Sequence, residues 1–129
     1  MNNKKSYKTG KLGEKIARNY LIGKGYQILD TNYHTHQGEI DLICRLNNIL
    51  VFVEVKTRTN QAFGYPEQAI TNQKQQRLAK AAQDFLQNHP ASYREIRVDA
   101  INIIFTTQDL AKISHLKNIL QDIDDNFES

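Results

Sequence analysis

The feature that most constrains the fold is a pair of apolar runs joined by two asparagines. Residues 38–46 and 49–57 are both rich in aliphatic and β-branched side chains, and Asn47 and Asn48 lie between them. Asparagine tolerates the positive φ that two-residue hairpin turns require. The pattern therefore predicts an antiparallel β-hairpin over this part of the chain.

The two-residue turn also predicts which residues of the hairpin face each other. In this register Asp41 lies directly opposite Glu54, and Glu39 lies directly opposite Lys56. Opposed side chains point to the same face of a sheet, with Cβ atoms about 4.5–5.5 Å apart. A three-residue loop would instead shift the register by one and place Asp41 beside Val53.

Two opposed carboxylates destabilise a hairpin unless a cation bridges them, a proton is shared or a base neutralises them. Mg²⁺ and Mn²⁺ commonly bind one or two protein carboxylates together with water and phosphate. Zinc is disfavoured because no set of thiolates or histidines lies nearby. From the spacing alone, a solvent-facing hairpin with a Glu39–Lys56 ion pair is an equal alternative. Apolar neighbours such as Ile40 and Val53 favour a hairpin inside the sheet.

The remaining apolar patterns predict two helices and further strands. The helical segments are residues 9–24 and 71–88, and the strand segments are residues 26–34, 94–105 and, as a short edge strand, 113–116. Thr71 is a good N-cap for the second helix, and Pro90 prevents its continuation. The order predicts an α/β fold with a central mixed sheet of about four to five strands and a helix on each face.

Length and composition fit a single domain spanning residues 1–129, with a flexible basic tail at 1–8 and a frayed C-terminus at 119–129. The formal net charge of +3 permits a polyanionic partner without requiring one. Cys44 is the single cysteine, so no internal disulfide forms, and a cytoplasmic location is expected. No window approaches the roughly 18 apolar residues of a membrane span, and no secretory signal is seen.

A series of short motifs resembles a known family. The hairpin segments 38–43 and 52–58 resemble the PD-(D/E)xK nuclease signature, with Ile40 in place of the proline. More narrowly, the chain is similar to the bacterial YraN family, which resembles Holliday-junction resolvases of the restriction-endonuclease-like fold. The other matching motifs are Gly13-Glu14, Gly25-Tyr26-Gln27-Ile28-Leu29, Phe63-Gly64-Tyr65-Pro66 and Arg97-Val98-Asp99. The resemblance covers residues 9–118, and the whole series in order is much more specific than the short motif.

The resemblance implies a role for each matching residue. Asp41 and Glu54 would be metal ligands, with the carbonyl of Val55 as a third, and Lys56 would be the catalytic lysine. Glu14 would be the acid of the first helix that completes the site. The implied function is Mg²⁺- or Mn²⁺-dependent endonucleolytic hydrolysis of DNA, with branched or damaged DNA as candidate substrates. Resolvase-like proteins commonly act as dimers, so a homodimer follows by analogy only.

Basic and aromatic residues suggest where a nucleic acid would lie. Arg58, Lys74 and Arg77 are candidate phosphate contacts, although a solvated helix face would carry the same charges. Phe63 and Tyr65 are suited either to stack on a base or to fix their loop.

Two other functions remain open from the sequence. A non-catalytic nucleic-acid-binding module would retain the same fold, and an interaction protein would keep an inert acidic pocket. Salt-dependent binding without metal identifies the first of these, whereas neither DNA binding nor stabilisation by metal is expected of the second.

Overall fold

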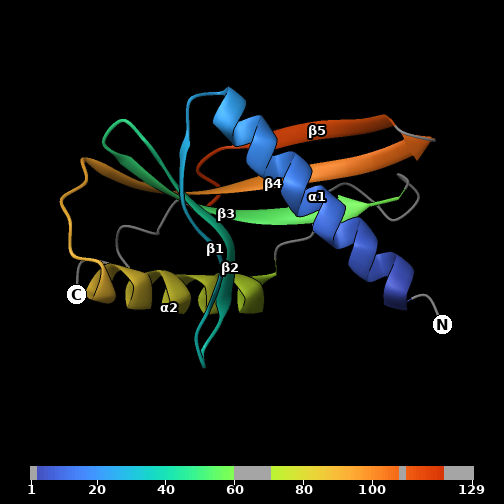
Figure 1. The fold of residues 1–129 in the computed structure, drawn as a ribbon. Coiled ribbons are helices and arrows are strands. Elements are labelled where there is room, and N and C mark those ends of the chain that lie inside the picture. Colours follow the sequence, from blue (N-terminus) through green and yellow to red (C-terminus); the bar gives the residue numbers. More distant parts are fainter. Residues whose placement is uncertain (1–2, 60–70, 108–109, 121–129) are drawn as a thin grey trace.

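The computed structural model describes residues 3–59, 71–107 and 110–120 of the chain. Its elements are α1 (Asn3–Gly23), β1 (Gln27–His34), β2 (Glu39–Leu46), β3 (Ile49–Arg58), α2 (Asn72–Asn88), β4 (Glu95–Thr107) and β5 (Leu110–Leu116). The strands form one five-stranded sheet in the order β1-β2-β3-β4-β5. Figure 1 shows α1 and α2 on opposite sides of this sheet. The predicted α/β class is confirmed, and the architecture is consistent with a restriction-endonuclease-like fold.

Strand β3 occupies the centre of the sheet, as the sequence predicts. It pairs antiparallel with β2 and parallel with β4, while β1 and β5 add antiparallel edge strands. Parallel neighbours require a crossover connection, and the segment between β3 and β4 contains α2. Because side chains alternate along a strand, β3 contributes to both faces of the sheet.

Helix α1 begins earlier than expected. The sequence places this helix at residues 9–24, whereas α1 runs from Asn3 to Gly23 and takes in most of the stretch expected to be a basic tail. Lysine is a good helix former, and this stretch contains several lysines and no proline. Gly25, with a φ of +94°, follows the helix where the chain turns toward β1. Neither described helix is long and apolar enough to cross a bilayer.

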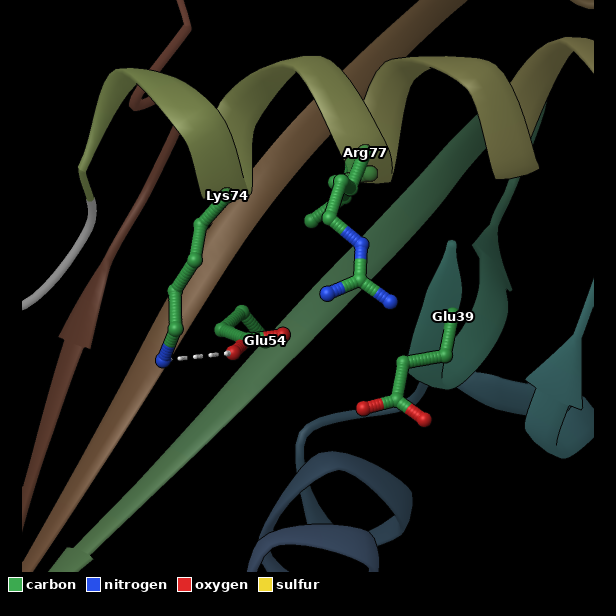
Figure 2. A pocket seen from close by; sticks show the side chains of 5 residues that line it. Glu39, Glu54, Lys74 and Arg77 are labelled. Carbon is green, nitrogen blue, oxygen red and sulfur yellow. Dashed lines mark ion pairs between the residues drawn. The ribbon is translucent and has the colours of Figure 1, made fainter. Parts of the chain in front are cut away.

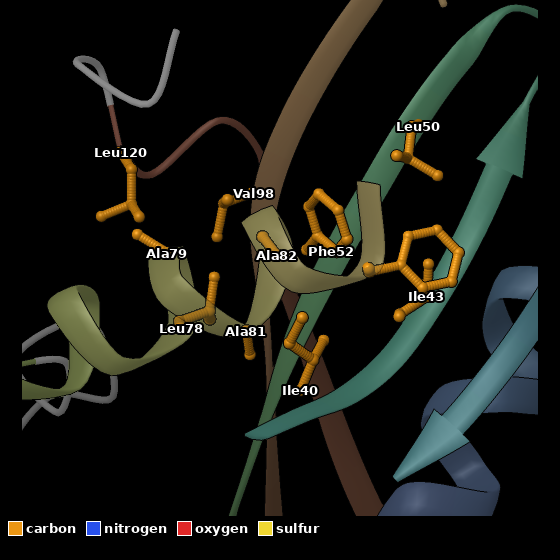
Figure 3. Close-up of a cluster of buried hydrophobic side chains, with 11 residues drawn as sticks. Ile40, Ile43, Leu50, Phe52, Leu78, Ala79, Ala81, Ala82, Val98 and Leu120 are labelled. Carbon is orange, nitrogen blue, oxygen red and sulfur yellow. The ribbon is translucent and has the colours of Figure 1, made fainter. Parts of the chain in front are cut away.

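Helix α2 covers the other face. Thr71 is its N-cap and accepts a hydrogen bond from the Lys74 amide at 3.2 Å, as predicted. The helix packs Leu78 and Phe85, with the alanines between them, on the sheet (Figure 3). Alanine adds little volume, so the helix lies close to the strands. The sheet side of this cluster consists of Ile40, Ile43, Leu50, Phe52 and Val98.

The α1-side core contains Ala17 and Leu21 of the helix and a complementary set of strand residues. These strand residues are Leu42, Cys44, Ile49, Val51, Val53, Ile101 and Ile103. Cys44 is fully buried, and burial raises the pKa of its thiol to about 12. It is therefore an inert core residue.

The C-terminal prediction is wrong for its first two residues. Residues 119–129 were expected to fray, but the Ile119 amide donates to the carbonyl of Val98 at 2.7 Å. Leu120 is buried in the α2-side core. Both side chains are apolar, and burying them beside α2 stabilises this segment. Residues 121–129 lie outside the described part.

Two glycines allow the helices to approach the sheet closely. A Cβ added to Gly13 of α1 would lie 2.1 Å from the Thr57 hydroxyl oxygen. A Cβ added to Gly38, just before β2, would lie 2.1 Å from the carbonyl oxygen of Arg77 in α2. Both contacts are far shorter than van der Waals separation, so these positions require glycine sterically.

We predict that Gly38→Ala lowers the free energy of unfolding by about 1–3 kcal/mol, because α2 must move away from its packed position. Urea denaturation measures this change. Gly10→Ala is the matched control: apart from its own helix backbone, no atom of the described residues lies within 4 Å of its added Cβ, and alanine is preferred over glycine inside a helix by about 0.5–1 kcal/mol. Equal stability of the Gly38→Ala and wild-type proteins would contradict the packing described.

Candidate functional site

The hairpin between β2 and β3 has the predicted register. Leu46 pairs with Ile49, and the ladder continues to the pair Leu42–Val53. Asn47 in the turn has a φ of +54°, the conformation for which asparagine is suited. The ladder ends at Leu42–Val53, one position before Asp41 and Glu54.

Beyond the last pair of the ladder, a side chain instead of a backbone carbonyl accepts the hydrogen bond between β2 and β3. The Val55 amide donates to Asp41 Oδ2 at 2.7 Å. Asp41 is thereby held against β3, and its carboxyl group is also hydrogen-bonded to Glu54. The predicted proximity of Asp41 and Glu54 is confirmed, although it results from this side-chain contact and not from continued strand pairing.

The expected Glu39–Lys56 pair is wrong for the described residues. Glu39 is paired in the sheet with His34 of β1, and its carboxylate lies 3.1 Å from His34 Nδ1. Lys56 Nζ lies 3.3 Å from Glu54 Oε1 instead. Because the β2–β3 ladder has already ended, no pairing holds Glu39 opposite Lys56. His34 is the last residue of β1.

The Asp41 carboxyl group is strongly perturbed. Burial is the largest cause, followed by the negative charge of Glu54, and together with the charge of Glu14 they raise the pKa of Asp41 to about 7. The hydrogen bond from the Val55 amide acts in the opposite direction. The structure thus brings the first-helix acid Glu14 within electrostatic range of the hairpin acids. The close packing of Gly13 on β3 places Glu14 there.

Glu54 is the best-compensated acid of the site. Its side chain is 17% exposed, and Lys56 (16% exposed) neutralises it from the same strand. Lys74 of α2 lies 4.0 Å from the same oxygen, Oε1 (Figure 2). A neighbouring base, one of the expected ways to tolerate paired carboxylates, is therefore present.

A pocket of about 90 Å³ opens beside this acid pair. It is lined by Glu39, Glu54, Lys74, Arg77 and Leu78. Figure 2 shows Lys74 and Arg77 extending from α2 toward the side where the two glutamates lie. Two of the three predicted substrate contacts, Lys74 and Arg77, therefore lie at a pocket that Glu54 also lines.

The third predicted contact, Arg58, is on β3 two residues beyond Lys56. It is half-buried, and its Nε is buried with no hydrogen-bond partner in the described part of the chain. The aromatic candidates Phe63 and Tyr65 lie outside the described residues. Glu14, Asp41, Glu54, Lys56, Lys74 and Arg77 converge from four elements, α1, β2, β3 and α2.

The donor atoms suit a hard divalent cation. Asp41 and Glu54 offer carboxylate oxygens in contact, and the repulsion that raises the pKa of Asp41 would be relieved by a bound cation. Residues 3–59, 71–107 and 110–120 contain no group of three or more His, Cys, Asp or Glu side chains arranged as a metal site. A cation site built from two carboxylates, water and phosphate does not need three such side chains.

The sequence does not predict a second polar cluster on the α1 side. Buried Asp99 accepts hydrogen bonds from Arg97 Nε at 2.9 Å and the Asn118 amide at 2.9 Å, and it lies 2.7 Å from His115 Nε2. Burial alone would raise the pKa of Asp99, but these partners hold it below its usual value. Asp99 thus ties β4 to the segment that follows β5, and the part played by His115 depends on the β4–β5 register, which no local pattern gives.

We predict that Asp41 gives folding a distinctive pH dependence. The folded pKa of about 7 exceeds the ordinary value of 3.8, so the folded protein binds this proton more tightly than the unfolded chain. The stabilisation from the proton is complete below about pH 4 and is lost as pH rises through about 7. The loss is on the order of a few kcal/mol.

Urea denaturation between about pH 4 and 8 measures this dependence. The side chain at position 41 of the variant Asp41→Asn is neutral at every pH and keeps an acceptor for the Val55 amide. The decrease in the free energy of unfolding that Asp41 causes as pH rises should therefore be absent from this variant. Asp30→Asn removes a carboxylate outside the site and should retain the wild-type profile. Identical profiles for Asp41→Asn and wild type would refute the assignment.

Comparison with known proteins places the chain in a family. The model of the uncharacterised protein family UPF0102 matches residues 13–103, a range that contains Glu14, Asp41, Glu54 and Lys56. This is the YraN family that the motifs resemble.

Individual relatives agree over nearly their whole length. The chain is 46% identical over 121 residues to a UPF0102 protein of Natranaerobius thermophilus, covering 92% of this chain and 98% of the relative. It is 44% identical over 109 residues to one from Syntrophomonas wolfei, covering 84% and 94%. A third, from Beutenbergia cavernae, is 38% identical over 110 residues, covering 85% and 93%. The chain therefore belongs to the uncharacterised protein family UPF0102.

Proposed function

We propose that this protein is a metal-dependent endonuclease that hydrolyses phosphodiester bonds of DNA. The observation that carries the proposal is the contact between Asp41 and Glu54 with Lys56 Nζ 3.3 Å from Glu54. Two partly buried acids in contact, of which Glu54 raises the pKa of Asp41, are unfavourable for folding, and such groups concentrate at functional sites. A lysine next to them supplies positive charge where a phosphate would lie.

Asp41 and Glu54 would hold Mg²⁺ or Mn²⁺, with the Val55 carbonyl as a third ligand. Such a cation, when bound, supplies positive charge to the scissile phosphate and lowers the pKa of a water molecule. The hydrogen bond from the Val55 amide holds the Asp41 carboxylate in place, with Glu54 beside it. The pair is therefore preorganised for a ligand that bridges two carboxylates.

Lys56 would stabilise the negative charge that grows on the phosphoryl oxygens and would orient the attacking water. Its ion pair with Glu54 keeps the ammonium group at the acid pair. Glu14, which adds negative charge near Asp41, would complete the acidic side of the site. Lys74 and Arg77 would bind backbone phosphates from the pocket side.

The substrate class, the assembly and the location are proposed by analogy with resolvases. Branched or damaged DNA is the proposed substrate class, a homodimer the proposed assembly and the cytoplasm the proposed location. The net charge of +3 suits a polyanionic substrate.

We predict that the protein cleaves at least one of four-way-junction, nicked or single-stranded DNA in the presence of Mg²⁺ or Mn²⁺. Asp41→Ala should abolish cleavage, and Lys56→Ala should lower the rate by about 10²–10³-fold, because a preorganised charge at the transition state is lost. Gel-based cleavage assays with labelled strands measure both. Lys24→Ala, which removes a lysine from the turn after α1, is the control and should cleave normally.

If the protein cuts none of these DNAs, or if cutting survives both substitutions, the proposed nuclease activity is rejected. One observation favours a non-catalytic nucleic-acid-binding module as the second candidate: Lys56 already neutralises Glu54, so the acid pair does not require a cation. That candidate predicts salt-dependent DNA binding which is unchanged by EDTA and by Glu54→Gln.

A further inference from the structure

The buried polar atoms that lack a partner are concentrated at one place. Within the described ranges, the buried side-chain nitrogen and oxygen atoms without a hydrogen bond are Arg58 Nε and both Nδ2 and Oδ1 of Asn102. Asn102 is 1% exposed. Arg97 and Asp99, the other buried polar or charged residues of the described ranges, are hydrogen-bonded to each other. Unpaired atoms are therefore a local property of two neighbouring strands.

The parallel pairing of β3 and β4 places Asn102 beside the candidate site. Lys56 is the ladder partner of Asn102. Ile101 and Ile103 pack in the α1-side core, so the intervening Asn102 points to the opposite face. Val55 likewise packs toward the α1 side, so Lys56 shares the face of Asn102.

The same face extends along β3. Glu54, Lys56 and Arg58 alternate with residues that point to α1, so all three share one side of the strand. Arg58 pairs with Ile104, the residue two positions after Asn102. The two residues with unpaired atoms therefore flank the position of Lys56, one along β3 and the other across to β4.

An unpaired buried amide destabilises a folded protein, and an apolar side chain of similar size would avoid that penalty. Retention of such groups next to charged residues is expected where they bind a ligand. An amide N–H and a guanidinium N–H are both donors, and phosphate oxygens are the acceptors they commonly meet in nucleic-acid complexes.

We propose that Asn102 and Arg58 form a subsite for a phosphoryl oxygen of the DNA strand, beside Lys56. The inference rests on the proposed function and adds a strand, β4, to the candidate site. Because these atoms are covered in the free protein, the side chains over them must move aside when the strand binds. Asn102 Nδ2 and Arg58 Nε then donate to the phosphoryl oxygen, and Asn102 Oδ1 accepts from a water molecule bound there. This subsite is separate from the pocket that Lys74 and Arg77 line.

The test combines DNA binding with stability. Asn102→Leu should weaken binding of a labelled four-way junction by about 10–100-fold, the loss expected for a hydrogen bond to a charged group. Fluorescence anisotropy with Ca²⁺ in place of Mg²⁺ measures the dissociation constant. The thermal unfolding midpoint of the free variant should equal or exceed that of wild type, because the unpaired amide has been removed.

Ile104→Val, on the same strand and face, is the control and should bind as wild type does. Asn102→Ser, which keeps a donor, should bind with intermediate affinity and serves if the leucine variant does not fold. Wild-type affinity in both Asn102 variants, or a clearly lower midpoint for Asn102→Leu and Asn102→Ser, overturns the subsite alone. A wild-type protein that binds none of the DNAs overturns the proposed function and the subsite with it.

Discussion

The hydrogen bond from the Val55 amide to the Asp41 carboxylate is the contact on which the site depends. It lies where the β2–β3 ladder ends and ties the two strands together without main-chain pairing. The bond also holds Asp41 in a half-buried position against Glu54. Lys56 and the hydrogen bond between the acids offset the resulting repulsion. The hairpin thus carries a group that is unfavourable for folding and that the proposed function uses to bind a cation.

The surrounding fold can accommodate this unfavourable arrangement because the central strand β3 contributes both to the core and to the candidate site. On the α1 side, β3 contributes Val51 and Val53 to the core. On the other side it supplies Leu50 and Phe52 to the α2-side core, and then, toward its end, charged residues to the site. Apolar burial along the first half of the strand stabilises the position of the charged second half. The helices reach this region closely because Gly13 and Gly38 carry no side chain.

Local signals in the sequence predicted much of the site. The Asn-Asn turn and the alternation of apolar residues determine the hairpin register, so the proximity of Asp41 and Glu54 followed from the sequence. Thr71 predicted the start of α2 in the same way. These predictions succeeded because turn conformation and helix capping depend on neighbouring residues alone.

The failures involve strand pairings that the Asn-Asn turn does not determine. Glu39 pairs with His34 across the β1–β2 turn, because the β2–β3 ladder ends at Leu42 and Val53, before it reaches Glu39. The placement of Asn102 beside Lys56 depends on a parallel register across a helical crossover. The contacts of His115 with Asp99 depend on the β4–β5 pairing. Such registers are decided by packing of the whole sheet and leave little trace in any one segment.

The central claim is that Asp41 and Glu54 form a divalent-cation site. Anomalous diffraction at the manganese edge, from crystals grown with Mn²⁺ above about pH 7 so that Asp41 is ionised, tests it most directly. The account predicts a manganese peak ligated by one oxygen of each carboxylate, and no peak in crystals of Glu54→Gln. Wild-type crystals without manganese between the two acids, or an undiminished peak in the Glu54→Gln variant, would contradict it.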